Sequence, residues 1–137
     1  MTASRSRALV KSFLDALNAA NHDAALAMLG EDVVHDTHDG RKIGKDEFRW
    51  FLGMASRNFR ETISDVAIMV DEGGGRAAAE FTARGVYLST VEGLPAADGQ
   101  SYALRDGMFF EIDDGLISRV TTTYNLKDWI AQVSDGG

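Results

Sequence analysis

Cysteine, proline and long hydrophobic runs are scarce in this sequence. Its 137 residues include no cysteine and a single proline. The lack of cysteine excludes a disulfide framework, a thiolate metal site and a cysteine nucleophile. No apolar run approaches the roughly 18 residues of a membrane-spanning helix, and residues 1–7 lack the hydrophobic stretch of a signal peptide. We therefore expect one cytoplasmic domain over residues 1–137, without a membrane partner.

Basic residues are also few. The chain has 14 Lys and Arg against 21 Asp and Glu, a net charge of -7. Nucleic-acid binding relies on clustered Lys and Arg, so this balance argues against a nucleic-acid partner. Hydrophobic residues, in contrast, make up 45% of the chain. A domain of this size buries roughly two-thirds of its unfolded surface, so it needs no disulfide or metal to fold.

The hydrophobic pattern changes period along the chain. Apolar residues recur at helical spacing first and alternate from about residue 62 onward. Helices are predicted over 9–17, 23–29, 45–60 and 127–133, with strands over 33–36, 63–70, 77–90, 101–112 and 116–125. We expect Ser4 or Ser6 to cap the first helix, Asp23 to cap the second and Gly30 to end it. Residues 37–44 and 92–100 are predicted loops, and 72–75 and 113–115 are predicted turns.

The predicted strands of 10 to 14 residues are longer than the usual five or six. Long strands in one sheet must coil, and Gly85 and Gly107 suit the places where they bend. Helices followed by an antiparallel meander give an α+β class. We therefore expect a cone-shaped, strongly bent, mostly antiparallel sheet. Three N-terminal helices would pack on its concave face and leave an internal pocket.

Three stretches of this sequence resemble the nuclear transport factor 2-like superfamily, in its SnoaL-like and ketosteroid-isomerase-like branch. The first runs from Phe13 to Asp36, where two helices lead to an acidic pair and a short strand. The second is Gly44-Lys-Asp-Glu-Phe-Arg-Trp-Phe51. The third joins residues 93–99 to the hairpin over 108–120. The resemblance covers nearly the whole chain and implies the same conical fold, which hosts isomerases, cyclases, dehydratases, epoxide hydrolases and non-catalytic binders.

The catalytic positions that the resemblance implies are occupied by other residue types. The tyrosine and the base of steroid isomerases correspond to Phe13 and Thr37, and their second acid to Met108. The His and Asp of SnoaL-type cyclases correspond to Met108 and Thr122. If the alignment is shifted by one residue, Asp36 or Asp106 occupies a catalytic position of the family.

Side-chain alternation along the strands predicts which residues face the pocket. If the Phe110 side chain points into the pocket, the side chains of Tyr102, Asp106 and Met108 lie on the same face of the sheet. The predicted ligand-binding residues are Phe13, Tyr87, Tyr102, Met108, Phe110, Thr122 and Tyr124. Such a mostly apolar, aromatic lining suits a small hydrophobic molecule. The tyrosines are also candidate hydrogen-bond donors to a carbonyl oxygen, although core or dimer packing explains them equally well.

Two residues are candidates for catalysis. His35 is the first candidate for a general base, because a neutral imidazole titrates near working pH. The alternative is a pocket-edge histidine bonded to Asp36, to Asp106 or to the backbone. Asp106 would orient His35 or act as an acid, since burial raises a carboxyl pKa. Alternatively, Asp106 pairs with the adjacent Arg105 at a strand edge.

No metal or cofactor is expected. His35 and His38 lie three apart on a predicted strand and point to opposite faces, and no third ligand has a recognisable spacing. Two functions remain open. One is an isomerase- or cyclase-like enzyme that moves a proton on a hydrophobic carbonyl compound; the other is a non-catalytic module that binds a small ligand. In either case we expect a homodimer formed through the sheet.

Overall fold

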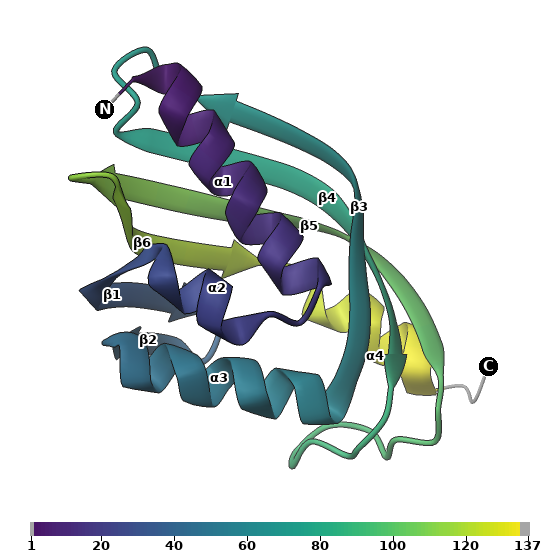
Figure 1. Cartoon of the computed structure of the whole chain (residues 1–137). Coiled ribbons are helices and arrows are strands. Elements are labelled where there is room, and N and C mark those ends of the chain that lie inside the picture. Colours follow the sequence, from purple (N-terminus) through teal and green to yellow (C-terminus); the bar gives the residue numbers. More distant parts are fainter. Residues whose placement is uncertain (1, 135–137) are drawn as a thin grey trace.

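The helices of the computed structural model, which describes residues 2–134, follow the apolar pattern closely (Figure 1). They are α1 (Ala3–Asn18), α2 (His22–Ala27), α3 (Lys45–Asn58) and α4 (Leu126–Ser134). The expected caps are wrong. Thr2 caps α1 by accepting from the Arg5 amide, and Asn21 caps α2 by accepting from the Ala24 amide. Each of these side chains reaches an N–H group that has no partner inside the helix.

Six strands make one mixed sheet, so the chain has an α+β fold. They are β1 (Leu29–Thr37), β2 (Gly40–Ile43), β3 (Phe59–Val70), β4 (Arg76–Tyr87), β5 (Ser101–Asp113) and β6 (Leu116–Thr123). Their order across the sheet is β2-β1-β6-β5-β4-β3. The β1–β6 pair is parallel and the others are antiparallel. Figure 1 shows β3, β4 and β5 curving along their length.

Three strand predictions need correction. The predicted loop over 37–44 contains β2, a short edge strand paired with β1. Gly30 does not end a helix, because α2 stops at Ala27 and Gly30 lies inside β1. β3 begins at Phe59, earlier than predicted, and its register shifts between Ser64 and Ala67, where Asp65 has a positive φ of 54°. Such a β-bulge breaks the strict alternation on which the prediction relied.

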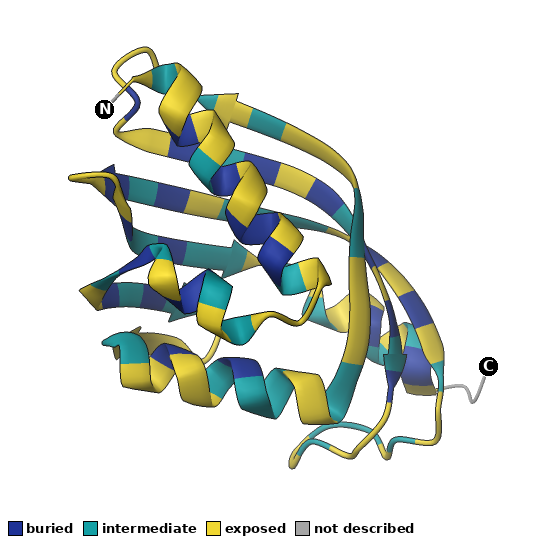
Figure 2. Ribbon diagram, viewed as in Figure 1, coloured by how far each residue is buried: buried dark blue, intermediate teal, exposed yellow. Residues whose placement is uncertain are grey.

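The two faces of the sheet differ in what covers them. We call the face that carries Phe81 and Phe110 the inner face, and the opposite face, which carries Phe109, the outer face. On the inner face Phe110 meets Phe13 of α1 edge-on, with ring centroids 6.0 Å apart. Every second residue of β4 from Ala77 to Tyr87 is buried (Figure 2), as the alternation predicts.

The C-terminal helix also packs on the inner face. Trp129 of α4 contacts Tyr87 and Tyr102, which share the inner face with Phe110. α1 and α4 therefore cover opposite ends of the long strands. A helix over 127–133 was predicted, but only the three N-terminal helices were expected to pack on this face, so the position of α4 is a correction. Trp50 of α3 is 63% exposed.

Candidate functional site

The predicted ligand-binding residues divide by burial. Phe13, Tyr87 and Phe110 are at most 1% exposed and belong to the hydrophobic core. Tyr102 is also buried, beneath Trp129. Met108, Thr122 and Tyr124 are only partly buried. Asp106, on the inner face of β5, is partly buried as well. The accessible part of the predicted set thus lies along β5 and the end of β6.

His35 is enclosed by aromatic rings. Its side chain, 3% exposed, lies between Phe48 and Phe51 of α3, with ring centroids 4.5 and 4.6 Å away. Its Nε2 is 3.4 Å from the Thr122 hydroxyl. Burial lowers the pKa of His35 to about 4, although the nearby Asp36 opposes this. The ring is therefore neutral at physiological pH and is a weak base there.

Asp106 forms no ion pair within the described part of the chain, residues 2–134. The neighbouring Arg105 bonds to Thr82 and to the Asp65 carbonyl and pairs with Glu80, so Arg105 does not form the alternative pair with Asp106. The buried Oδ1 of Asp106 has no hydrogen-bond partner. Burial and the charge of Glu61 raise the pKa of Asp106 to about 7. A carboxyl that titrates near neutrality is suited to accept and return a proton.

A glycine on β4 lets side chains of its two neighbouring strands, β3 and β5, meet. Glu61 of β3 and Tyr102 of β5 are both paired with Gly85 of β4. The Tyr102 hydroxyl reaches over Gly85 and donates to Glu61 Oε2 at 2.5 Å. A Cβ at position 85 would collide with the Tyr102 ring and lie 2.8 Å from Glu61 Cγ. Gly85 is therefore required by a close approach of side chains.

Glu61 was missed by the sequence interpretation. Glu61 is exposed by surface area, yet desolvation raises the pKa of its carboxyl. The hydrogen bond from Tyr102 lowers this pKa, but by less than desolvation raises it. Glu61 is thus accessible to water, while its carboxylate contacts Tyr102. Continuing the alternation backward from Ile63 places Glu61 on the inner face. That signal was available, but the predicted strand began two residues too late.

The three tyrosines differ in how their hydroxyls are used. Tyr87 donates to the Pro95 carbonyl at 2.7 Å and accepts from the Val91 amide at 3.0 Å, which fixes the loop after β4. The Tyr102 hydroxyl donates its hydrogen bond to Glu61. Within the residues that the structure describes, the Tyr124 hydroxyl has one polar contact, at 3.5 Å from His38 Nε2. Burial, with the charges of Asp39, Asp106 and Glu61, raises the pKa of Tyr124 to about 12, so it stays protonated.

Neither His35 nor Asp106 is hydrogen-bonded to a tyrosine within residues 2–134. The polar groups of the inner face nevertheless form one electrostatic cluster. We call Glu61, Tyr102, Asp106 and Tyr124 the acidic cluster, because the charges of its two carboxylates raise the pKa values of both tyrosines.

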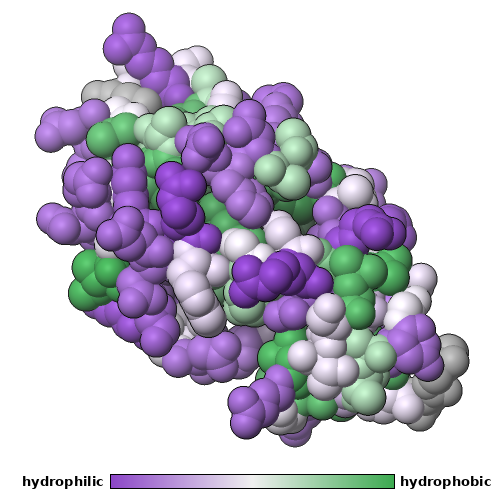
Figure 3. All heavy atoms as spheres, turned by 60° about the horizontal axis from the view of Figure 1, so that its bottom comes forward, coloured by the Kyte–Doolittle hydropathy of each residue, from purple (hydrophilic) through white to green (hydrophobic). Residues whose placement is uncertain are grey.

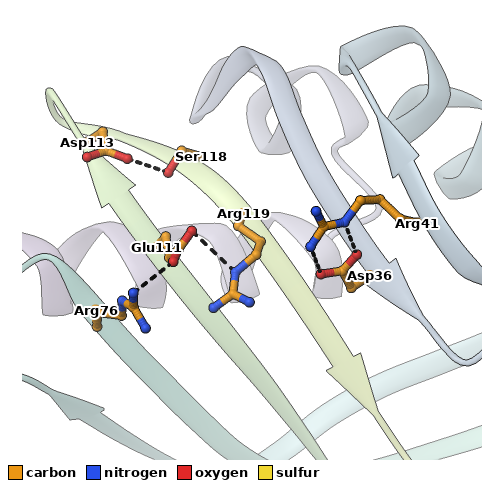
Figure 4. Close-up of polar contacts among 7 residues, drawn as sticks. All are labelled: Asp36, Arg41, Arg76, Glu111, Asp113, Ser118 and Arg119. Atoms are coloured by element: carbon orange, nitrogen blue, oxygen red, sulfur yellow. Dashed lines mark hydrogen bonds and ion pairs between the residues drawn. The ribbon is translucent and has the colours of Figure 1, made fainter.

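Asp36 points away from this cluster. It accepts two hydrogen bonds from Arg41, at 2.8 and 2.9 Å, on the outer face of the sheet (Figure 4). These hydrogen bonds hold the pKa of Asp36 below its ordinary value. Beside it, Glu111 bridges Arg76 and Arg119. Asp36 is therefore a member of an outer-face ion-pair network, and shifting the alignment by one residue does not make it a pocket base.

The outer face also carries a groove. Its volume is about 500 Å³, and its lining includes Met69, Arg76, Phe109, Arg119 and Thr121. Phe109 is 47% and Met69 51% exposed. Seen from the side of α3, the surface is mainly hydrophilic, with hydrophobic groups scattered among polar ones (Figure 3). Exposed hydrophobic area on the sheet thus lies away from the acidic cluster.

The described residues, 2–134, show neither a metal-binding cluster nor a membrane-spanning helix. No cluster of three His, Asp or Glu side chains is arranged to hold a metal ion there. His38 contacts Tyr124, and His35 contacts Thr122. In the same range no helix has both the length and the apolar character needed to cross a membrane.

Solved structures similar to this chain share its fold throughout. A candidate polyketide cyclase from Pseudomonas putida is 48% identical, with 97% of this chain and 98% of that chain covered and a TM-score of 0.92. One from a Silicibacter species is 44% identical, with 98% of both chains covered and a TM-score of 0.94. An epoxide hydrolase-like protein from Mycobacterium tuberculosis, at 20% identity, 97% and 92% coverage and a TM-score of 0.76, shares the fold.

The family comparison covers most of the chain. No protein with a curated description matches it. The model of the SnoaL-like domain matches residues 10–120, which include α3, the long strands and most of the polar inner face. The helix order and mixed sheet agree with this match. The chain therefore belongs to the SnoaL-like domain family of the nuclear transport factor 2-like superfamily.

Proposed function

We propose that this chain is a cofactor-independent, isomerase- or cyclase-like enzyme that moves a proton on a hydrophobic carbonyl compound. The compound would lie in a conical recess over the inner face, between α3 and α4. The single observation that supports this most is Asp106: within residues 2–134, its buried Oδ1 has no hydrogen-bond partner and its carboxyl group forms no ion pair. Similar chains described as candidate polyketide cyclases favour this chemistry over simple binding.

The proposed chemistry assigns one role to each group. The Asp106 carboxylate takes a proton from the carbon next to the carbonyl, which leaves an enolate on the substrate. The Tyr124 hydroxyl donates to the enolate oxygen, because its proton is held only by a 3.5 Å contact with His38. Asp106 then returns the proton to another carbon of the same molecule. No redox partner is needed, because the bonding electrons stay on the substrate.

His35 has a different role in this proposal. With a pKa of about 4, it accepts a proton poorly at neutral pH, whereas Asp106 titrates near 7. We therefore move the base from His35, the first candidate from the sequence, to Asp106. His35 orders the wall of the recess by packing against Phe48 and Phe51 and bonding to Thr122.

The test is proton exchange on a ligand. Hydrophobic ketones are incubated with the protein in deuterated buffer, and NMR follows uptake of deuterium next to the carbonyl. Asp106→Asn should lower the exchange rate about 100-fold or more, and Tyr124→Phe should lower it less. Asp114→Asn is the control, because Asp114 lies in the β5–β6 turn with a positive φ that Asn tolerates. Exchange that survives Asp106→Asn would remove Asp106 from the mechanism.

The alternative function is a module that holds a ligand without reacting. The hydroxyls of Tyr87 and Tyr102, which protein groups already satisfy, favour it. The unpartnered Oδ1 of Asp106 counts against it. If ketones bind to the wild-type protein but show no proton exchange, the protein is the binding module and not the enzyme.

We also propose that two copies pair through their outer sheet faces. The groove holds exposed Phe109 and Met69 next to two buried polar atoms that make no hydrogen bond within residues 2–134: Thr121 Oγ1, and Arg119 Nε, which lies 3.4 Å from Glu111 in an ion pair. A second copy would cover the hydrophobic side chains and supply hydrogen bonds for these atoms. This interface would leave the inner face free for the ligand.

A further inference from the structure

We propose that Glu61 is a specificity-determining residue which, together with Asp106, makes the acidic cluster select ligands whose polar group is an uncharged carbonyl or hydroxyl and reject carboxylates. This inference rests on the function proposed above. It adds a residue and a substrate class that the function itself does not require.

The first argument is that Glu61 is held in place. Its carboxylate accepts the Tyr102 hydroxyl at 2.5 Å, and Tyr102 is in turn fixed beneath Trp129, with ring centroids 5.9 Å apart. The reach of Tyr102 depends on the missing Cβ of Gly85. A side chain on the edge strand β3 is thus drawn over the inner face by a residue two strands away. An exposed glutamate without this partner would sample many rotamers.

The second argument is the lack of positive charge. Within residues 2–134, the arginine and lysine ion pairs go to other acids, such as Arg105 to Glu80 and Arg84 to Asp65, and neither Glu61 nor Asp106 has one. His35 is neutral at physiological pH. A ligand carboxylate entering this cluster would meet two acids and no counter-charge, which is unfavourable in a partly desolvated site.

The third argument is the balance of protons. The titratable groups around Asp106 are Glu61 on β3, Tyr102 on β5 and Tyr124, which follows β6. His38 and Asp39 lie next to Tyr124. The charge of Glu61 favours the protonated form of Asp106, and desolvation favours the protonated form of each. A protonated carboxyl donates a hydrogen bond to a carbonyl or hydroxyl oxygen, as Tyr124 does. The cluster therefore offers donors to a neutral oxygen.

Ligand selectivity tests the inference without requiring turnover. The probes share the indane ring and differ only in the group attached: ketone, alcohol or carboxylate. NMR titration of the wild-type protein at neutral pH should show the ketone and the alcohol binding at least about tenfold more tightly than the carboxylate. In Glu61→Gln, carboxylate binding should tighten several-fold while ketone binding changes little. Gln keeps an oxygen that accepts the Tyr102 hydroxyl, so the fold is preserved.

A second readout follows the carboxyl groups themselves. NMR titration of side-chain carboxyl carbons should show the Asp106 midpoint moving to lower pH in Glu61→Gln, because a like charge is removed. Glu80→Gln is the matched control, since Glu80 is exposed and paired with Arg105. Gly85→Ala is a second variant, expected to displace Tyr102 and to weaken the same selectivity.

The outcomes separate this inference from the proposed function. Wild-type protein that binds the carboxylate as tightly as the ketone, or an Asp106 midpoint that does not move in Glu61→Gln, would overturn it. Loss of exchange activity in Asp106→Asn bears only on the proposed function. An active enzyme without this selectivity would refute the role of Glu61 alone.

Discussion

Single residues of the inner face combine burial with titration. His35 is neutral when folded because burial lowers its pKa, and Asp106 is protonated to a higher pH because burial raises its pKa. The two shifts affect stability in opposite directions. Below about pH 6.5 the unfolded state binds a proton at His35 that the folded state does not, so stability falls toward pH 4. The folded state keeps a proton on Asp106 that the unfolded state loses. The stability that this proton contributes is therefore lost as pH rises from about 4 to 7.

His35→Leu should therefore change the pH dependence of stability. The variant lacks the imidazole but keeps an apolar contact with Phe48 and Phe51. Relative to wild type, it should gain stability progressively as pH falls from 6.5 to 4, by an amount on the order of 2–3 kcal/mol at the lower end. Urea unfolding at several pH values measures this. A difference that does not vary with pH would show that the His35 pKa is not lowered.

Asp106→Asn is the complementary case. It should gain stability above pH 7, because the wild-type protein must then ionise a partly buried carboxyl without a cation. The gain should be roughly 2–4 kcal/mol and should vanish near pH 4. The same unfolding series checks it, with Asp114→Asn as the control. A variant less stable than wild type at pH 8 would contradict the assignment.

At the scale of elements, buried polar contacts join segments that are distant in sequence. Ser6 of α1 is fully buried, and its hydroxyl donates to the Gly74 carbonyl in the β3–β4 turn at 2.5 Å. Gly74 has a positive φ of 77°, and an added Cβ would lie 2.8 Å from the Thr2 backbone. The turn is thus packed tightly against the start of α1. Ser6, one of the two expected helix caps, in fact anchors the helix to the sheet.

Ser6→Ala should destabilise the protein by about 1–3 kcal/mol, because it leaves the Gly74 carbonyl without this donor. Ser4→Ala is the matched control, since Ser4 is an exposed neighbour in the same helix. Thermal unfolding of both variants measures the difference. Equal melting temperatures for the two would show that the Ser6–Gly74 bond contributes nothing.

At the scale of the whole molecule, the two faces of the sheet serve different proposed roles. The inner face carries the acidic cluster and the helices, and the outer face carries the groove with its ion-pair network. Phe109→Glu would place a charge in the centre of the proposed interface. We expect sedimentation to show a dimer for wild type and a monomer for this variant. Trp50→Glu, on the exposed side of α3, should not change the mass.

The sequence alone determined the class of fold because periodicity reports burial. The change from helical spacing to alternation located α1, α3, α4 and the four long strands, and the alternation correctly placed Tyr102, Asp106 and Phe110 on one face. Local signals failed where tertiary contacts override them. Gly30 was drawn into β1, which is held by pairing to β6, a partner far along the chain.

Only the tertiary structure decided which polar groups meet. Glu61 and Tyr102 are 41 residues apart, and they touch because Gly85 on the strand between them has no side chain. His35 and Asp106 were both predicted as titrating groups, but their pKa values move in opposite directions. Burial disfavours the charged form of each, which is the protonated form of a histidine and the ionised form of an aspartate. Sequence fixes which groups are present, and packing fixes their surroundings and hence their chemistry.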